Sequence, residues 1–157
     1  MLKMRKYQRL VKKIHQLLPT YRAMTDETLQ NQTEVLQSML SQGKPLVELL
    51  PQAFAVIIEA DKRVLGLEPY EVQVLGGLAL FFGNIAEIKT GEGKTLVATL
   101  PLYARALEGK KGNFLITANE YLAERDGQEM GRVFDWLGLS VGIGVGDEEQ
   151  DIEGKRR

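Results

Sequence analysis

Residues 84–95 read NIAEIKTGEGKT, and this stretch decides the fold of the chain. The apolar segment 84–89 is typical of a short strand, and it runs directly into a glycine loop. The loop opens the amphipathic run KTLVATLPLYARALEG, which predicts a helix over 94–109 with a kink at Pro101. A strand, a glycine loop and a helix in this order are the usual context of a phosphate-binding loop.

The loop carries the groups that phosphate binding needs. Its glycines allow the backbone to fold around an anion with N–H groups pointing inward, and the following helix adds its positive end. Lys94 would reach the β- and γ-phosphates, the Thr95 hydroxyl would hold magnesium, and Glu92 would face solvent because an inward carboxylate repels phosphate. The predicted binding residues here are Thr90, Gly91, Glu92, Gly93, Lys94 and Thr95, with Lys94 and Thr95 also catalytic.

The match to the strict G-x-x-x-x-G-K-[ST] pattern is incomplete, because Ile88 stands where the first glycine would be. The tighter form T-G-x-G-K-T is typical of helicase-like ATPase motors. The competing interpretation is a glycine turn that caps an ordinary helix. The strand before the loop and the helix after it favour the phosphate loop.

Strands and helices alternate after the loop. NFLIT (113–117) and LSVGIGV (139–145) predict two further strands, and Asn119 can cap a helix that runs to about Leu137. This alternation predicts an α/β fold with a parallel, helix-covered sheet. Together with the tight phosphate loop, it fits the start of a P-loop motor domain. Three strands are few for such a sheet, so we expect it to be cut off at the C-terminus, in residues 147–157.

The part before residue 66 has a different character. One of the 16 glycines, Gly43, precedes Gly66, and the spacing of apolar residues predicts helices. The first expected helix covers 7–18 and ends soon after, because of Pro19. The second is capped by Thr25 or Asp26 and runs to Leu40. Three more are opened by prolines, at Pro45, Pro51 and Pro69. We therefore divide the chain into a helical segment, 1–66, and a partial nucleotide-binding lobe, 67–157.

Composition excludes several classes of protein. With 157 residues, of which 44% are apolar and 26% charged, the chain has the make-up of an ordinary globular protein. It has no cysteine and one histidine, His15, which excludes disulfide scaffolds, cysteine zinc sites and sites that need two histidines. No apolar run approaches the roughly 18 residues of a spanning helix, and the start lacks a secretory signal, so we expect a soluble, intracellular chain.

Charge is balanced over the whole chain but not locally. The net charge of −1 argues against a protein that binds nucleic acid through a basic surface. The first helix combines an apolar stripe with six cations: Lys3, Arg5, Lys6, Arg9, Lys12 and Lys13. Such a helix can bind an anionic membrane surface, or it can pack on its own domain or a dimer partner with its cations in solvent. Both interpretations remain open.

ATP hydrolysis needs more than a phosphate loop: an acidic residue for magnesium and water, and usually an arginine from a second lobe. Glu120 is a poor candidate because we expect it at the start of a helix, and Asp147 follows a segment with three glycines. We expect the catalytic acid to lie beyond Arg157 in a longer parent chain. Arg125 and Asp126 fit either a role beside the nucleotide or an ion pair on a helix surface.

Five stretches of the chain match a known family when they are taken together. They are ADKRVLG (60–66), YEVQVLGG (70–77), GNIAEIKTGEGKTLVATLPLYARALEGK (83–110), TANEYLAERD (117–126) and WLGLSVG (136–142). In combination they resemble SecA, the ATPase motor of bacterial preprotein translocation. The resemblance covers residues 50–145 well, extends to the helical segment 21–37 and is weakest in the last dozen residues. It implies a RecA-like motor lobe with ATP and Mg²⁺ as cofactors.

The resemblance also assigns a role to Gln73, which stands where the family's glutamine recognises adenine. An amide can donate to N7 of adenine and accept from its N6 amine at the same time. Without the resemblance, a solvated helix residue is an equally good interpretation of Gln73. Glu71 and Glu120 stand where the family has aspartate, which points to an accessory SecA paralogue as one interpretation.

A full SecA is several times longer than this chain. It has a second nucleotide-binding lobe, a preprotein cross-linking domain, a helical scaffold and a wing. The resemblance therefore implies the N-terminal part of a protein-export motor, an ATPase that moves unfolded preproteins through the Sec channel. We expect no ATP turnover by this part alone. The expected partners are the Sec channel, preproteins, acidic phospholipids and a second copy of the parent, without nucleic acid, in the cytoplasm at the inner face of the cell membrane.

Two other functions are consistent with the residues. A helicase-type motor acting on RNA or DNA shares the tight phosphate loop and an upstream glutamine, although the motor lobe lacks a clear basic stripe. The third interpretation is a dimerising or membrane-docking module without catalysis, in which the phosphate loop is vestigial.

Overall fold

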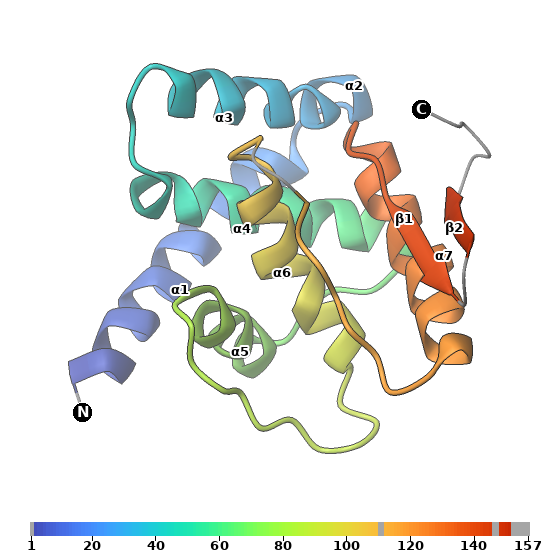
Figure 1. The fold of residues 1–157 in the computed structure, drawn as a ribbon. Helices are drawn as coiled ribbons and strands as arrows, with labels where there is room; N and C mark the ends of the chain where they lie inside the picture. The colour runs from blue at the N-terminus through green and yellow to red at the C-terminus, as the bar shows by residue number, and fades with distance from the viewer. Residues whose placement is uncertain (1, 110–111, 146–147, 152–157) are drawn as a thin grey trace.

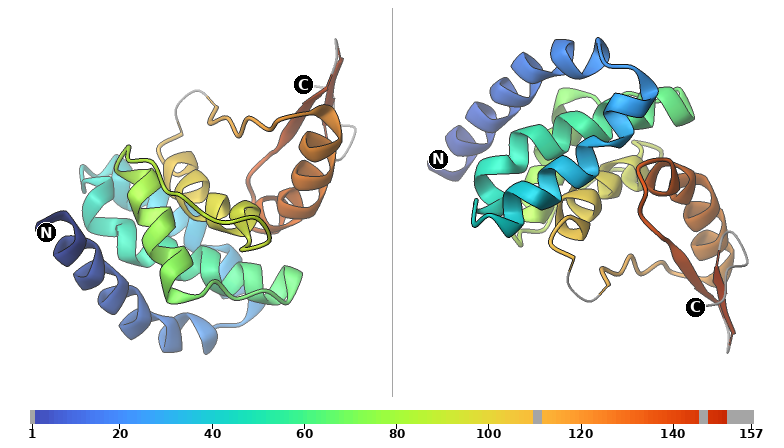
Figure 2. Two further views of the ribbon diagram at one scale, coloured as in Figure 1. Left: turned by 90° about the horizontal axis from the view of Figure 1, so that it is seen from below. Right: turned by 90° about the horizontal axis from the view of Figure 1, so that it is seen from above.

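The computed structural model describes residues 2–109, 112–145 and 148–151, and these form seven α-helices and two β-strands. The helices are α1 (Leu2–Arg22), α2 (Asp26–Gln30), α3 (Gln32–Ser41), α4 (Leu46–Leu65), α5 (Glu71–Phe81), α6 (Lys94–Ala106) and α7 (Glu120–Trp136). The strands are β1 (Gly142–Val145) and β2 (Glu148–Asp151). Helices α1 to α6 pack into one body, and α7 and the two strands lie along one side of it (Figures 1 and 2).

Helix α4 is the centre of the packing. Residues 53–58 of α4 are apolar on every side of the helix, and all six are buried. A helix that is apolar all round belongs in the interior, and α4 accordingly contacts α1, α3, α6 and α7. One continuous hydrophobic core includes Ile14 of α1, Phe54 of α4, Tyr103 of α6 and Val133 of α7. The parts on either side of residue 66 therefore share a core.

The structure corrects the prediction that Pro45 and Pro51 open separate helices. Pro45 is the N-cap of α4, and Pro51 lies inside the same helix. Proline cannot donate a hydrogen bond to the carbonyl four residues earlier, which here belongs to Val47. Val47 lies at an exposed position, where water can satisfy that carbonyl. The helix continues because the residues that follow Pro51 are held by burial.

The single helix predicted from Thr25 or Asp26 to Leu40 is divided in two at Asn31. Thr25 is the N-cap of α2, and its hydroxyl accepts a hydrogen bond from the N–H of Thr28 at 3.2 Å. Asn31 ends α2 and precedes α3. Asparagine is a weak helix former because its side chain competes for backbone hydrogen bonds. The helices predicted after Pro69 and after Asn119 are present as α5 and α7.

The expected parallel sheet is not present among the described residues. The segments 84–89 and 113–117 have no strand partner. Of the three predicted strands, 139–145 alone contributes one, β1, and β1 pairs antiparallel with β2. The register places Gly142 opposite Asp151. Strands need neighbours for their backbone N–H and C=O groups, and the described residues offer none to the first two segments. The strand β2 was not predicted from the sequence.

A buried carboxylate joins α4 to α6. Asp61 is fully buried, and its Oδ2 accepts a hydrogen bond from the hydroxyl of Thr99 at 2.9 Å. Burial raises the pKa of Asp61 well above the ordinary value, and the hydrogen bond from Thr99 opposes that rise. Because α6 begins at the phosphate loop, this contact fixes the helix that presents the loop.

Arg63 of α4 fastens the C-terminal end of α1. Its guanidinium donates hydrogen bonds to the carboxylates of Glu59 at 2.8 Å and Asp26 at 2.7 Å. It also donates to three backbone carbonyls at the end of α1, those of Tyr21, Arg22 and Met24. The basic N-terminal helix is thus fixed to the body at its C-terminal end, and its apolar stripe, from Tyr7 to Tyr21, is buried in the core. In the described parts of the chain, no helix is both long and apolar enough to cross a membrane.

Candidate functional site

The phosphate-loop residues form a turn at the N-terminus of α6. Gly91 and Gly93 have φ angles of +84° and +71°, in the left-handed region that favours glycine. Gly93 is the N-cap of α6, and no side chain caps this helix. The first N–H groups of a helix have no partner within it, and the helix dipole makes them a favourable place for an anion. The turn therefore has the backbone chemistry of a phosphate site.

The next two residues, Lys94 and Thr95, begin α6 in different surroundings. Lys94 is exposed, whereas Thr95 is half-buried and its hydroxyl donates a hydrogen bond to Oδ2 of Asp126 at 3.3 Å. A threonine hydroxyl has one hydrogen and two lone pairs. With the hydrogen directed to Asp126, the lone pairs are left for a cation. The donor set therefore fits the magnesium role predicted for Thr95.

Thr90, Gly91 and Glu92 all lie at exposed positions. The carboxylate of Glu92 turns back onto the loop, where its Oε2 accepts a hydrogen bond from the N–H of Lys89 at 3.2 Å. This contact closes the loop over three residues. It was not predicted, because repulsion between Glu92 and phosphate does not reveal which backbone donors of the loop the carboxylate can reach.

The structure brings Gln73 against the phosphate loop. In the first turn of α5, its Oε1 accepts from the N–H of Tyr70 at 2.7 Å, and its Nε2 donates to the carbonyl of Glu92 at 2.8 Å. A Cβ atom at position 93 would lie 2.7 Å from Nε2 of Gln73. Position 93 therefore favours glycine for its backbone angle, and a side chain there would displace the amide of Gln73. Helix α5 packs against α6, which keeps the glutamine beside the loop.

Arg125 and Asp126 of α7 lie beside the same loop. The guanidinium of Arg125 donates to Oδ1 of Asp126 through Nε at 2.9 Å and through NH2 at 2.6 Å. These bonds to Asp126 raise the pKa of Arg125. The ion pair considered from the sequence is thus present, and Asp126 also contacts Thr95. The contact with Thr95 depends on how α7 packs beside α6, which the sequence pattern does not reveal.

Of the two acidic candidates for hydrolysis, the structure describes Glu120 alone. Glu120 is the exposed first residue of α7, behind the N-cap Asn119, whose side chain accepts from the N–H of Leu122 at 2.9 Å. Asp147 lies outside the described residues. Within the described residues, no hydrogen bond connects Glu120 to the phosphate loop.

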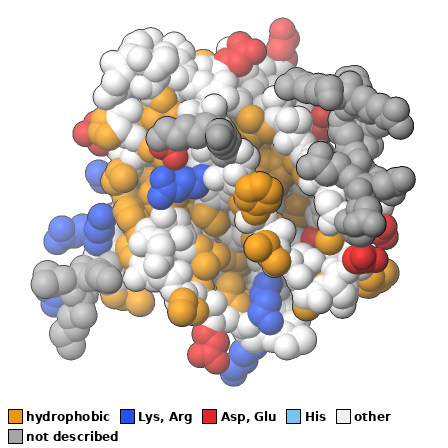
Figure 3. Space-filling view, viewed as in Figure 1, with side chains coloured by type: hydrophobic (Ala, Val, Ile, Leu, Met, Phe, Trp, Pro, Cys, Tyr) orange, Lys and Arg blue, Asp and Glu red, His pale blue; other side chains and the backbone are white. Residues whose placement is uncertain are grey.

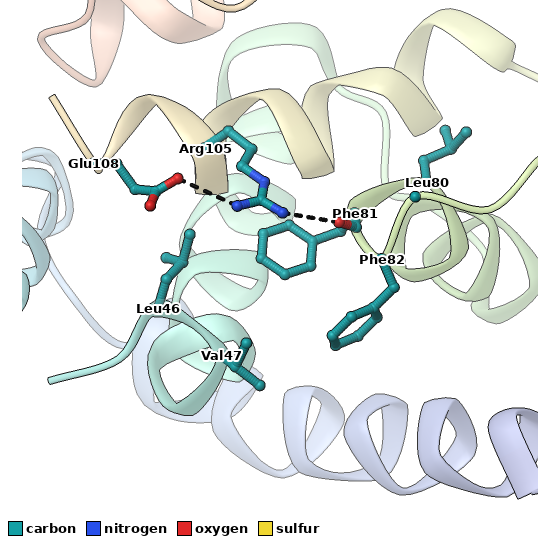
Figure 4. A pocket seen from close by; sticks show the side chains of 8 residues that line it. Leu46, Val47, Leu80, Phe81, Phe82, Arg105 and Glu108 are labelled. Atoms are coloured by element: carbon teal, nitrogen blue, oxygen red, sulfur yellow. Dashed lines mark hydrogen bonds and ion pairs between the residues drawn. The ribbon is translucent and has the colours of Figure 1, made fainter. Parts of the chain in front are cut away.

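A surface hollow of about 660 Å³ lies at the other end of α6 (Figure 4). It is lined by Leu46, Val47, Leu80, Phe81, Phe82, Gly83, Arg105 and Glu108. The cation of this hollow, Arg105, is already engaged: it donates to the carbonyl of Phe81 at 3.1 Å, pairs with Glu108 at 3.3 Å and lies 4.2 Å from the centre of the Phe81 ring. The guanidinium of Arg105 is therefore committed to contacts within the protein.

Comparison with known sequences settles the family. The sequence model of the SecA DEAD-like domain matches residues 1–157. The chain belongs to the SecA family. This match favours the protein-translocation interpretation over the helicase-type motor.

The SecA relatives are much longer than this chain. "Protein translocase subunit SecA 2" of Lactobacillus johnsonii is 53% identical over 148 residues, which cover 94% of the chain and 19% of that relative. The SecA 2 protein of Streptococcus agalactiae serotype III is 53% identical over 149 residues, covering 95% and 19%. "Protein translocase subunit SecA" of Stenotrophomonas maltophilia is 51% identical over 140 residues, covering 89% and 15%. The chain thus spans less than a fifth of these relatives, and both SecA names occur at similar identity.

Proposed function

We propose that this chain is the nucleotide-binding N-terminal part of an ATP-driven protein-translocation motor. Residues Gly91 to Thr95 hold the phosphates, Gln73 recognises adenine, and Thr95 contributes to a magnesium site. The observation that supports this best is the hydrogen bond between Gln73 and the carbonyl of Glu92. This bond joins the amide of Gln73 to the loop at Glu92, although 19 positions separate the two residues in sequence.

The amide of Gln73 has a donor and an acceptor that its hydrogen bonds within the protein do not use. A glutamine amide has two N–H donors and an oxygen with two lone pairs. Tyr70 uses one lone pair and Glu92 uses one donor, so one of each remains. Adenine presents an acceptor at N7 and a donor at N6, whereas guanine presents acceptors at both N7 and O6. The remaining donor and acceptor of Gln73 therefore complement adenine and not guanine.

Base selectivity tests this proposal. In calorimetric titrations with magnesium, the wild-type chain should bind ADP roughly 10- to 100-fold more tightly than GDP, the discrimination typical of one bidentate base contact. Gln73→Ala should reduce this ratio to near one. Gln73→Glu is the matched variant, because it keeps an acceptor for Tyr70 but loses the amide donor. Equal affinity of the wild type for ADP and GDP would contradict the assignment of Gln73.

The magnesium role rests on the chemistry of the loop. Magnesium is usually held by one or two protein oxygens together with phosphate oxygens and water. Thr95 supplies one such oxygen next to the helix N-terminus, and Lys94 supplies a positive charge at the same turn. When bound, the ion neutralises charge on the β- and γ-phosphates. We propose that the groups needed for hydrolysis come from outside this chain, so that this part alone does not turn over ATP.

We further propose that segments 84–89 and 113–117 become strands of a RecA-like parallel sheet in the complete motor lobe, the region from residue 67 onward. Large apolar side chains at Ile85, Phe114 and Ile116 are 98%, 86% and 90% exposed. Hydrophobic side chains gather across the middle of the face that segment 112–118 crosses (Figures 1 and 3). Side chains of this kind are normally covered, and the relatives have the additional length to cover them.

The partners of the whole protein follow from the same proposal. The relatives' names describe translocase subunits. We propose that the parent acts on preproteins at the Sec channel, as a homodimer in the cytoplasm at the inner face of the cell membrane, without a nucleic-acid partner.

Anionic lipid is the remaining proposed partner, and α1 supplies its binding surface. Arg5, Arg9, Lys12 and Lys13 are exposed, while Lys6 lies 4.1 Å from the centre of the Phe82 ring. Cations near an anionic membrane contribute about 1 kcal/mol each, so replacing three should weaken binding roughly 100-fold. Arg9→Gln/Lys12→Gln/Lys13→Gln should therefore reduce co-sedimentation with phosphatidylglycerol vesicles at low salt to background.

The control for lipid binding is Lys44→Gln/Arg132→Gln, which removes exposed cations outside α1. This variant should retain most of the binding. Vesicle binding that is unchanged in the α1 variant would show that α1 is not the lipid-binding surface.

A further inference from the structure

We propose that Asp126 is a positioning residue for the magnesium site: it holds the hydrogen of the Thr95 hydroxyl and so turns the lone pairs of that oxygen toward the cation. This inference rests on the proposed nucleotide site. It gives Asp126 of α7, for which the sequence left a role beside the nucleotide open, a defined part in that site.

The hydroxyl of Thr95 donates a hydrogen bond to Asp126, and the direction of this bond supports the proposal. Oγ1 of Thr95 lies 3.3 Å from Oδ2 of Asp126. An ionised carboxylate can only accept, so the shared hydrogen belongs to the hydroxyl. A hydroxyl that binds a cation must direct its hydrogen away from the metal, and a fixed acceptor behind it sets that orientation in advance. Acceptors of this kind, one step removed from a metal, orient the direct ligands.

Asp126 is itself held in place from two sides. Its other oxygen, Oδ1, accepts two hydrogen bonds from Arg125, which compensate the charge of a side chain at a largely buried position. The backbone next to it is fixed by close packing: a Cβ atom at Gly127 would lie 2.7 Å from Cγ1 of Ile143 in β1. Asp126 therefore presents Oδ2 to Thr95 from a helix that is packed closely against β1.

The test compares ADP affinity with saturating magnesium and with EDTA. The ratio of the two affinities is the magnesium increment. Asp126→Asn keeps the size of the side chain, but its amide would donate to Thr95 and occupy a lone pair of the hydroxyl. Loss of an outer partner typically costs 10- to 100-fold in metal affinity. We expect the magnesium increment to fall by about that factor, with the EDTA affinity nearly unchanged.

Two further variants separate positioning from a structural role. Thr95→Val removes the hydroxyl at nearly constant volume, and adding Asp126→Asn to it should cause no further loss of the increment, because Asp126 acts through Thr95. Asp135→Asn makes the same chemical change at an exposed position on α7 and should leave the increment as in the wild type.

The outcomes distinguish this inference from the proposed function. If the wild type binds no ADP in either condition, both are overturned. If it binds ADP and Asp126→Asn keeps the full increment, the inference alone is overturned and the nucleotide site stands. A variant that loses affinity equally with magnesium and with EDTA also overturns it, since that pattern indicates a structural role.

Discussion

Replacing Lys94 with alanine should weaken nucleotide binding by this chain strongly while leaving its fold intact. Lys94 is the first residue of α6 and is exposed, directly after the left-handed turn at Gly93. A charged group that bonds to phosphate contributes about 1.5–3 kcal/mol, which corresponds to roughly a 10- to 100-fold loss of affinity. An exposed side chain without structural contacts affects stability little. Calorimetric titration with ADP and magnesium, beside thermal unfolding, measures both effects.

The matched control is Lys89→Ala, which removes an exposed cation at the start of the same loop. Lys89 precedes the turn, so its removal should weaken ADP binding only slightly. Equal losses in the two variants would indicate general attraction of an anion and not a phosphate site.

The same two variants test whether this chain hydrolyses ATP. An ATPase rate in this chain that disappears in Lys94→Ala would contradict the proposal that hydrolysis needs groups from outside it.

The local elements of the fold could be predicted from the sequence. The caps at Thr25 and Asn119 depend on residues close in sequence, and the structure confirms them. The prediction that Pro51 opens a separate helix was wrong, because burial of α4 outweighs the hydrogen bond that proline cannot donate. Local propensity gives the ends of helices, whereas tertiary packing decides whether a helix continues through an unfavourable residue.

The pairing of strands and the contacts around the phosphate loop could be predicted only in part from the sequence. The alternation of apolar residues marked 84–89 and 113–117 as strands, but a strand exists only with a partner, and a pattern within one segment does not contain the partner. The phosphate loop could be predicted because all its groups are contiguous. Gln73 was found through a resemblance, and the bond between Thr95 and Asp126 links residues 31 positions apart. Contacts of that kind require the packing of helices to be known.

The second large effect is expected at Gly77, where α5 crosses α6. A Cβ atom there would lie 2.7 Å from Cδ1 and 3.0 Å from Cβ of Leu100, and 3.3 Å from Cε1 of Phe54. Leu100 and Phe54 are both fully buried. The Cβ of Leu100 is fixed to its backbone, so the clash cannot be relieved by a side-chain rotation alone. Gly77→Val should force the two helices apart and lower the free energy of unfolding by about 3 kcal/mol or more, at the upper end for overpacked cores.

The adjacent Gly76 provides a control on the same helix. A Cβ atom there would lie 3.4 Å from Val97 and 3.7 Å from Ile88, which is ordinary contact. Gly76→Ala should therefore stabilise the chain by about 0.5–1 kcal/mol, the usual helix preference for alanine over glycine. Urea unfolding measures both changes.

Because α5 carries Gln73 and α6 begins at the phosphate loop, Gly77→Val should also weaken ADP binding under conditions in which it remains folded. Unfolding midpoints that are equal in the Gly77 variant and the wild type would show that α5 and α6 do not cross this closely.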